Sequence, residues 1–138
     1  MTVPGDIARI NRELIERFRA EGGAPEGRHL LLLTTVGVRS GRRRTTPMMW
    51  IDDDGARLLV VASNAGAPRH PDWYRNLVAN PDVTVEITGD TYEATAVPLR
   101  GEERERVFAW ICEQYPFFAD HQAKVERRIP VVALERRA

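Results

Sequence analysis

The stretch that decides the fold runs from residue 29 to residue 51 and reads HLLLLTTVGVRSGRRRTTPMMWI. Its first part, His29–Thr35, is a continuous apolar run of strand length, which predicts a strand covered on both faces. Thr45–Ile51 predicts a second strand, and Pro47 within it indicates a sheet edge or a bulge. Glycines and arginines separate the two runs, so we expect a hairpin with a basic loop.

Turn signals and alternating patterns farther along the chain predict four more strands and the helices that cover them. The strands are expected at Arg57–Ser63, Val83–Ile87, Tyr92–Ala96 and Ile129–Leu134. The helices are expected from Asp6, as a cap, to Gly22-Gly23, and at Asp72–Ala79, Glu102–Tyr115 and Ala119–Arg127. Short antiparallel strands with covering helices predict a small six-stranded antiparallel β-barrel of the α+β class.

Length and composition place the chain among folded, single-domain proteins. We expect one domain over residues 1–138, with an N-terminal helix in residues 1–23 and the barrel core in residues 29–134. Apolar residues make up 43% and charged residues 29%, which is too apolar for a disordered chain. Twenty basic residues balance twenty acidic ones, and this net charge of zero argues against a nucleic-acid partner.

The first helix bears on location and assembly. No apolar run approaches the roughly 20 residues that span a bilayer, and charges interrupt Ile7–Phe18, so no signal peptide is expected. Because Arg and Glu mix on its polar face, packing on the domain is favoured over contact with lipid or a partner. We expect a cytoplasmic protein, a monomer or a homodimer, with peripheral contact at the inner membrane face left open.

Residues typical of metal and nucleophilic sites are sparse. His29, His70 and His121 are scattered without an acid or thiol at ligand spacing, so no metal site is expected. Asp52–Gly55 is interpreted as a solvated hairpin turn. The single cysteine, Cys112, excludes an internal disulfide and lies on a helix that is expected to face the core.

The loop between the first two strands departs from the global charge balance. It holds four arginines within Arg39–Arg44 and no acidic residue. Mutual repulsion of these cations favours a bound anion, and Gly37 and Gly41 permit close approach of the backbone. Arg39 and Arg44 are candidates for bidentate contacts, with Ser40 as a further donor. The alternative is a solvated basic loop.

A second loop and a short helix supply weaker signals. The polar and Gly-containing segment Ala62–Ala67 follows the third predicted strand and is expected beside the first loop. The next helix carries Trp73, Tyr74 and Asn76. Its aromatic side chains are suited to flank a planar ligand, although Trp73 equally suits the core.

Three blocks of sequence resemble a known family in their order and spacing. They are LLLTTVGVRSGRRRTTPMMW (31–50), VVASNAGAPRHPDWYRNLVANPDV (60–83) and QYPFFADHQAKVERRIPVVAL (114–134). The chain resembles the deazaflavin-dependent nitroreductase family, split β-barrel oxidoreductases that use coenzyme F420, a deazaflavin with an acidic phosphate-and-glutamate tail. The resemblance covers about Leu30 to Leu134 and implies a split barrel, this cofactor and an F420H2-dependent reductase.

The resemblance also implies which residues form the site. The cofactor-binding positions are Arg39, Ser40, Gly41, Arg44, Thr45, Thr46, Pro47, Met48, Met49, Ala62, Ser63, Asn64, Gly66, Trp73 and Asn76. The substrate-binding positions are Met49, Ser63, Tyr115, Phe118 and His121, with Tyr115 as the candidate proton donor. Better-known members carry lysine at Arg39 and Asn64 and tyrosines where this chain has Met49, Phe118 and His121, which disfavours activation of bicyclic nitroimidazoles.

The implied reaction is hydride transfer from reduced F420 to a small electron-poor acceptor: a quinone first, then a nitroaromatic or an enone. The cofactor supplies the reactive chemistry, so no catalytic motif is required of the protein. An FMN-binding enzyme on the same barrel would also need an arginine-rich phosphate loop and remains the main alternative. A non-enzymatic nucleic-acid-binding barrel is disfavoured by the zero net charge and 7% aromatic content.

Overall fold

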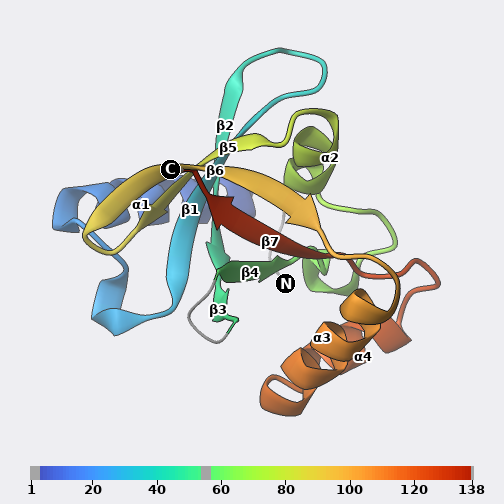
Figure 1. The fold of residues 1–138 in the computed structure, drawn as a ribbon. Helices are drawn as coiled ribbons and strands as arrows, with labels where there is room; N and C mark the ends of the chain where they lie inside the picture. Colours follow the sequence, from blue (N-terminus) through green and yellow to red (C-terminus); the bar gives the residue numbers. More distant parts are fainter. Residues whose placement is uncertain (1–3, 54–56, 138) are drawn as a thin grey trace.

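A computed structural model of the chain describes residues 4–53 and 57–137. These residues form an α+β fold in which four helices surround one curled antiparallel sheet of seven strands (Figure 1). The strands are β1 (Leu30–Val36), β2 (Arg43–Met49), β3 (Ile51–Asp52), β4 (Leu58–Val61), β5 (Asp82–Ile87), β6 (Asp90–Pro98) and β7 (Val131–Arg136). The helices are α1 (Pro4–Glu21), α2 (Asp72–Ala79), α3 (Gly101–Gln114) and α4 (Phe117–Ala123).

The order of the strands explains why the sheet curls. It runs β2-β1-β5-β6-β7-β4-β3, so β2 and β3 lie at opposite edges although only Trp50 separates them in the chain. The two edges must therefore approach one another at Trp50, whose backbone N–H donates to the carbonyl of His29 at 3.0 Å. The result is a half-barrel, and the edge position predicted from Pro47 is confirmed.

The expected count of six strands is wrong among the described residues, because Thr45–Ile51 is not one strand. Up to Met49 the chain pairs with β1, in the register Leu30 to Met49. It then leaves β1, and Ile51 pairs with Leu59 of β4. A single straight strand cannot serve two partners at opposite edges, so the break at Trp50 is imposed by the curl of the whole sheet.

The prediction that the first strand is covered on both faces is confirmed. Leu30 through Thr35 are all buried. Leu31 and Leu33 pack inside the curl with Val60 and Val85, whereas Leu30 and Leu32 pack outside against Phe18 of α1. A third cluster lies between the sheet and the pair α3 and α4 and includes Leu59, Ile111 and Ile129.

The helix boundaries agree with the sequence only in part. Helix α2 spans the expected residues, but α1 begins at Pro4, so Asp6 lies in its first turn and is not the cap. Helix α4 is Phe117–Ala123 in place of Ala119–Arg127. Strand β7 is displaced in the opposite direction, toward the C-terminus, to Val131–Arg136 in place of Ile129–Leu134, because residues 124–130 form an irregular segment.

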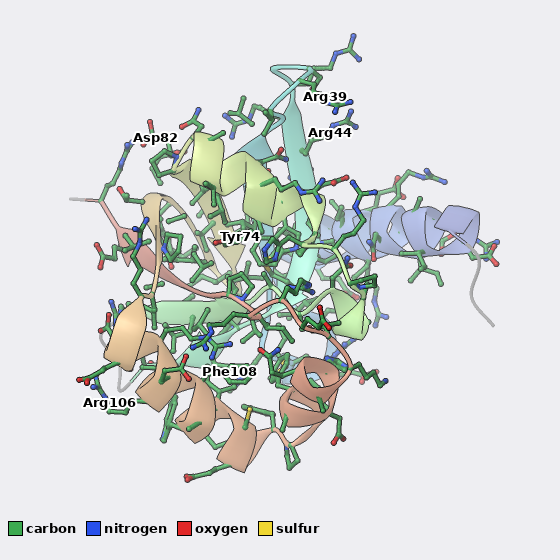
Figure 2. All side chains as sticks on the ribbon, turned by 90° about the vertical axis from the view of Figure 1, so that its right-hand side faces the viewer. Arg39, Arg44, Tyr74, Asp82, Arg106 and Phe108 are labelled. Atoms are coloured by element: carbon green, nitrogen blue, oxygen red, sulfur yellow. The ribbon has the colours of Figure 1, made fainter. Side chains whose placement is uncertain are left out.

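Helix α1 is only partly packed. Its second half covers the sheet through Phe18, which is 3% exposed, but Ile7 and Ile10 are each 48% exposed. Figure 2 shows this helix extending to the right, beyond the edge of the sheet. Of the predicted turn Asp52–Gly55, residues 54 and 55 lie outside the described residues. No helix in the described segments is long and apolar enough to cross a membrane.

Candidate functional site

A groove of about 940 Å³ lies between the β1–β2 loop and helix α2. We call it the basic groove. Seven of the expected cofactor-binding residues line it: Arg39, Ser40, Arg44, Thr45, Thr46, Trp73 and Asn76. Figure 2 shows Arg39 and Arg44 at the top of the view, beyond the end of α2.

The β1–β2 loop is held in a defined shape by its own backbone. The Gly37 N–H donates to the Arg42 carbonyl at 2.8 Å, and the Gly41 N–H donates to the Gly37 carbonyl at 3.0 Å. Gly41 has a φ of 69°, which favours glycine. A Cβ on Gly37 would lie 2.6 Å from the Ser40 hydroxyl oxygen, so the Ser40 side chain would have to move to admit one. The arginines therefore project from a fixed support.

Asn76 fastens this loop to helix α2. Its amide oxygen accepts from the Val38 N–H at 3.1 Å, and its amide nitrogen donates to the Thr35 hydroxyl at 3.1 Å. Asn76 is 8% exposed and Thr35 is 1% exposed, so the bond between them is made away from water, whereas the bond from Val38 is only partly buried. A buried side chain thus sets the distance between the two walls of the basic groove.

The charge of the groove is strongly unbalanced. Besides Arg39 and Arg44, Arg69 and Arg75 line it, against the one carboxylate of Asp72. Within residues 4–53 and 57–137, none of these four guanidinium groups pairs with a carboxylate. By contrast, three carboxylates surround Arg57, at Asp53, Glu103 and Glu135. This donor set suits a ligand with several negative charges.

Sequence reasoning missed Arg69 and Arg75. Arg75 stands next to the predicted Asn76 and three residues after Asp72, so helical spacing was a usable signal for its position. Arg69 lies in the irregular segment before α2, where no periodicity indicates a direction. Both arginines also border a smaller hollow of about 290 Å³ with Asn64 and His70.

The loop that follows β4 borders that smaller hollow and has an unusual backbone. Ala62 and Ser63 are buried, and the next residues, Asn64 and Ala65, have φ values of 49° and 54°. The amide nitrogen of Asn64 donates to the Arg69 carbonyl at 3.0 Å. A Cβ on Gly66, whose φ is 80°, would lie 3.4 Å from the Cα of His121, so this loop touches α4 closely.

The expected substrate-binding residues gather in a second place. Tyr115, Phe118 and His121 belong to an aromatic cluster with Phe117, in which the Tyr115 and Phe118 ring centroids are 6.4 Å apart. Met49 packs against the same core cluster as Tyr115 and Phe118. The Nδ1 atom of His121 is buried without a hydrogen-bond partner among the described residues.

The remaining expected cofactor-binding residues lie outside the lining of the basic groove: Gly41, Pro47, Met48, Met49, Ala62, Ser63, Asn64 and Gly66. Met48 packs against the inner core cluster. The expected site is therefore divided between the basic groove and the aromatic cluster, and β2 and the loop after β4 connect the two. No group of His, Cys, Asp and Glu in the described segments is arranged to hold a metal.

Comparisons with known proteins point the same way. A family model described as F420H(2)-dependent quinone reductase matches residues 7–136. An F420H(2)-dependent quinone reductase of Mycobacterium tuberculosis (strain ATCC 25618 / H37Rv) is 36% identical over 118 residues, which cover 83% of this chain and 76% of that protein.

Two solved structures are similar in sequence and fold. One, an F420-H2 dependent reductase (FDR-A), is 41% identical with a TM-score of 0.69, covering 78% of this chain and 95% of that one. The other, described as a domain-swapped dimer, is 39% identical with a TM-score of 0.71, covering 96% of this chain and 100% of that one.

Proposed function

The chain belongs to the F420H(2)-dependent quinone reductase family, and we propose from this that its basic groove holds the acidic tail of coenzyme F420. The protein is a coenzyme F420-dependent oxidoreductase. The observation that carries the proposal is a set of four arginines in one groove, opposite a single aspartate, with no carboxylate partner in residues 4–53 and 57–137. Guanidinium groups of this kind fit a phosphate followed by carboxylates, which is the chemistry of that tail.

Each wall of the groove has a separate role in this proposal. Arg39 and Arg44 hold the phosphate, with the Ser40 hydroxyl as a third donor. Arg69 and Arg75, on the opposite wall, take carboxylates of the tail where the family's better-known members use a lysine at the position of Asn64. Thr45–Met49 of β2 and the loop at Ala62–Gly66 border the ring.

The proposed acceptor is a quinone, which the aromatic cluster and Met49 suit as apolar, planar surfaces. When bound, the reduced deazaflavin supplies a hydride to the acceptor, and a quinone then needs one proton to become a hydroquinone. The half-buried Tyr115 is the proposed proton donor. Phe118, at 6% exposure, provides packing beneath Tyr115 and His121.

Tyr115→Phe is expected to lower kcat at least fivefold with unchanged affinity for F420. An unchanged kcat in this variant would assign the proton to water.

Cofactor titration tests the proposal directly. Purified protein is titrated with F420, FMN and NADP separately while cofactor fluorescence is followed. Binding of F420 in the micromolar range is expected, and binding of FMN alone would reject the proposal.

Replacement of both Arg39 and Arg44 by alanine is expected to weaken F420 binding at least 100-fold, since each charge-assisted contact contributes about 1.5–3 kcal/mol.

Arg42→Ala is the matched control for that double variant. Arg42 is an exposed arginine of the same loop that does not line the basic groove. It is expected to retain F420 affinity within twofold. Equal losses in both variants would mean that general positive charge, and not the groove, binds the cofactor.

Assembly and location complete the proposal. We propose a homodimer formed through α1, because Ile7 and Ile10 stand exposed on a helix that extends past the sheet. We also propose a cytoplasmic location. One similar solved structure is described as a domain-swapped dimer. Light scattering after gel filtration is expected to give twice 15.6 kDa, and Ile7→Glu/Ile10→Glu to give the monomer. A wild-type monomer would reject this arrangement.

A further inference from the structure

Arg127 reaches from the irregular segment after α4 into the loop that follows β4. Its guanidinium donates to three backbone carbonyls: Ser63 at 2.7 Å, Ala67 at 3.1 Å and Ala62 at 3.2 Å. It also meets Nδ1 of His70 at 3.0 Å, and because arginine only donates, this nitrogen accepts. One side chain therefore gathers four acceptors from residues 62–70.

The partners of Arg127 are unusual for a cation. Within the two described segments it forms no ion pair, and burial lowers its pKa from the ordinary arginine value. Its charge is compensated by carbonyl dipoles, which the planar fork of guanidinium engages in fixed directions. A lysine supplies the same charge without that fork.

The segment that Arg127 holds has two backbone hydrogen bonds of its own, from Gly66 N–H to the Ser63 carbonyl and from Ala67 N–H to the Asn64 carbonyl, both at 2.9 Å, yet its backbone is strained. Asn64 and Ala65 both occupy the left-handed region, with φ values of 49° and 54°, and Gly66 follows at 80°. This region is unfavourable for residues with a Cβ, and it persists only where surrounding contacts over-determine it. The carbonyls of Ala62, Ser63 and Ala67 flank these three residues on both sides, so Arg127 clamps the strained turn at its two ends.

The clamped loop connects the two parts of the site. Asn64 and Arg69 border the smaller hollow, and Arg69 also lines the basic groove. Gly66, on the other side of the loop, lies against His121 of the aromatic cluster. We infer that Arg127 is a positioning residue for cofactor binding: it fixes residues 62–70 in the shape that joins the basic groove to the aromatic cluster. This inference rests on the proposed function, because the loop borders the cofactor only if F420 binds there.

The test compares Arg127→Met and Arg127→Lys with two controls. Arg128→Met changes the exposed neighbour, which pairs with Glu105, and Arg57→Met removes a half-buried, ion-paired arginine remote from the groove. F420 dissociation constants, steady-state kinetics and amide hydrogen exchange are measured for each protein. Both Arg127 variants are expected to bind F420 at least tenfold more weakly, with a raised KM for F420H2 and faster exchange in residues 62–70. Both controls are expected to bind F420 within twofold of wild type.

The outcomes separate the possible failures. If wild type does not bind F420, the proposed function fails. If wild type binds and Arg127→Met binds equally well while folded, only the inference fails. If Arg127→Met does not fold, Arg127→Lys decides, and wild-type affinity in that variant would overturn the role of the guanidinium fork. If Arg57→Met loses as much affinity as the Arg127 variants, the effect is general destabilisation and the inference is rejected.

Discussion

Asn76 is a single buried side chain that fastens the β1–β2 loop to helix α2 and so fixes the shape of the basic groove. Its amide bonds to the Val38 N–H and to the Thr35 hydroxyl, and the second of these bonds is buried. Asn76→Ala leaves both groups without a partner, so we expect a loss of about 1–3 kcal/mol in the free energy of unfolding. We also expect weaker F420 binding, because the loop is no longer fastened to α2.

The control for Asn76 is Asn80, which directly follows the last residue of α2. Asn80→Ala removes one exposed bond to the Asp82 N–H and is expected to cost less than about 1 kcal/mol. Urea denaturation with cofactor titration measures both quantities. Unchanged affinity in a destabilised Asn76→Ala would show that the loop keeps its shape without this anchor.

His70 gives the site a pH dependence. Burial, Arg127 and Arg75 all lower its pKa from the ordinary value of 6.5. The folded protein therefore binds this proton more weakly than the unfolded chain does, and the stability present above about pH 6.5 falls as the pH drops below it. Protonation also places a proton on Nδ1, opposite a donor of Arg127.

Thermal unfolding between pH 5 and pH 8 measures this dependence against His70→Gln, in which all other titrating groups are kept. Wild type is expected to lose more stability than the variant below pH 6.5. Parallel curves for the two proteins would mean that His70 titrates at its ordinary pKa.

Residues that could be predicted from the sequence belong to local segments, whereas residues that were missed act through contacts with distant parts of the chain. Arg39, Ser40 and Arg44 stand in one short loop between two strands, so local composition was enough to single them out. Arg127 contacts residues 57 to 65 positions away in the chain, and nothing near it in sequence indicates those partners. Such a role is decided by how the C-terminal segment crosses the loop after β4.

At the scale of elements, helix α1 is joined to the β5–β6 hairpin at its C-terminal end. The Ala24 N–H donates to the Thr88 hydroxyl at 3.0 Å, and Arg19 makes two bonds to Glu86. A Cβ on Gly23 would lie 2.5 to 2.8 Å from three Thr88 side-chain atoms. Gly23→Ala is therefore expected to cost about 1–3 kcal/mol in stability, because Thr88 must move and release Ala24.

Denaturation of a double-mutant cycle measures this clash. Thr88→Ala removes the two nearest atoms, so Gly23→Ala should cost less in that background than in wild type. Equal costs in the two backgrounds would place the strain elsewhere than at Thr88.

The elements themselves were predictable where their signals are local. The apolar run at His29–Thr35 correctly predicted a strand, and β1 begins and ends one residue later. Helix α2 was predicted with its observed first and last residues. The break at Trp50 was not predictable, because it depends on the place of β4 in the sheet, and β4 pairs with β7 from the far end of the chain. The shift of α4 has a similar origin: in residues 124–130, Arg127 bonds to the loop after β4 and the Ile129 carbonyl accepts from Arg104 of α3.

At the scale of the whole molecule, the net charge of zero conceals a separation of charge. Twenty basic and twenty acidic residues cancel, yet the basic groove brings four arginines to one acid. A net charge of zero argues against a long polyanion as a partner. The local excess of positive charge in the basic groove suits one small acidic cofactor. Attraction of such a cofactor must then be short-ranged and sensitive to salt, since the Debye length shrinks from about 10 Å at 0.1 M to about 3 Å at 1 M.

F420 affinity is accordingly expected to fall several-fold as ionic strength rises from about 0.1 M to about 1 M, mainly through a slower association rate. Stopped-flow fluorescence at several salt concentrations measures that rate. The deazaflavin ring without its phosphate-and-glutamate tail is the matched ligand and should bind with little dependence on salt. The Arg39→Ala/Arg44→Ala variant should show a shallower dependence for F420 itself. If tailless and full cofactor respond to salt alike, the groove does not bind the tail, and its arginines serve some other anion.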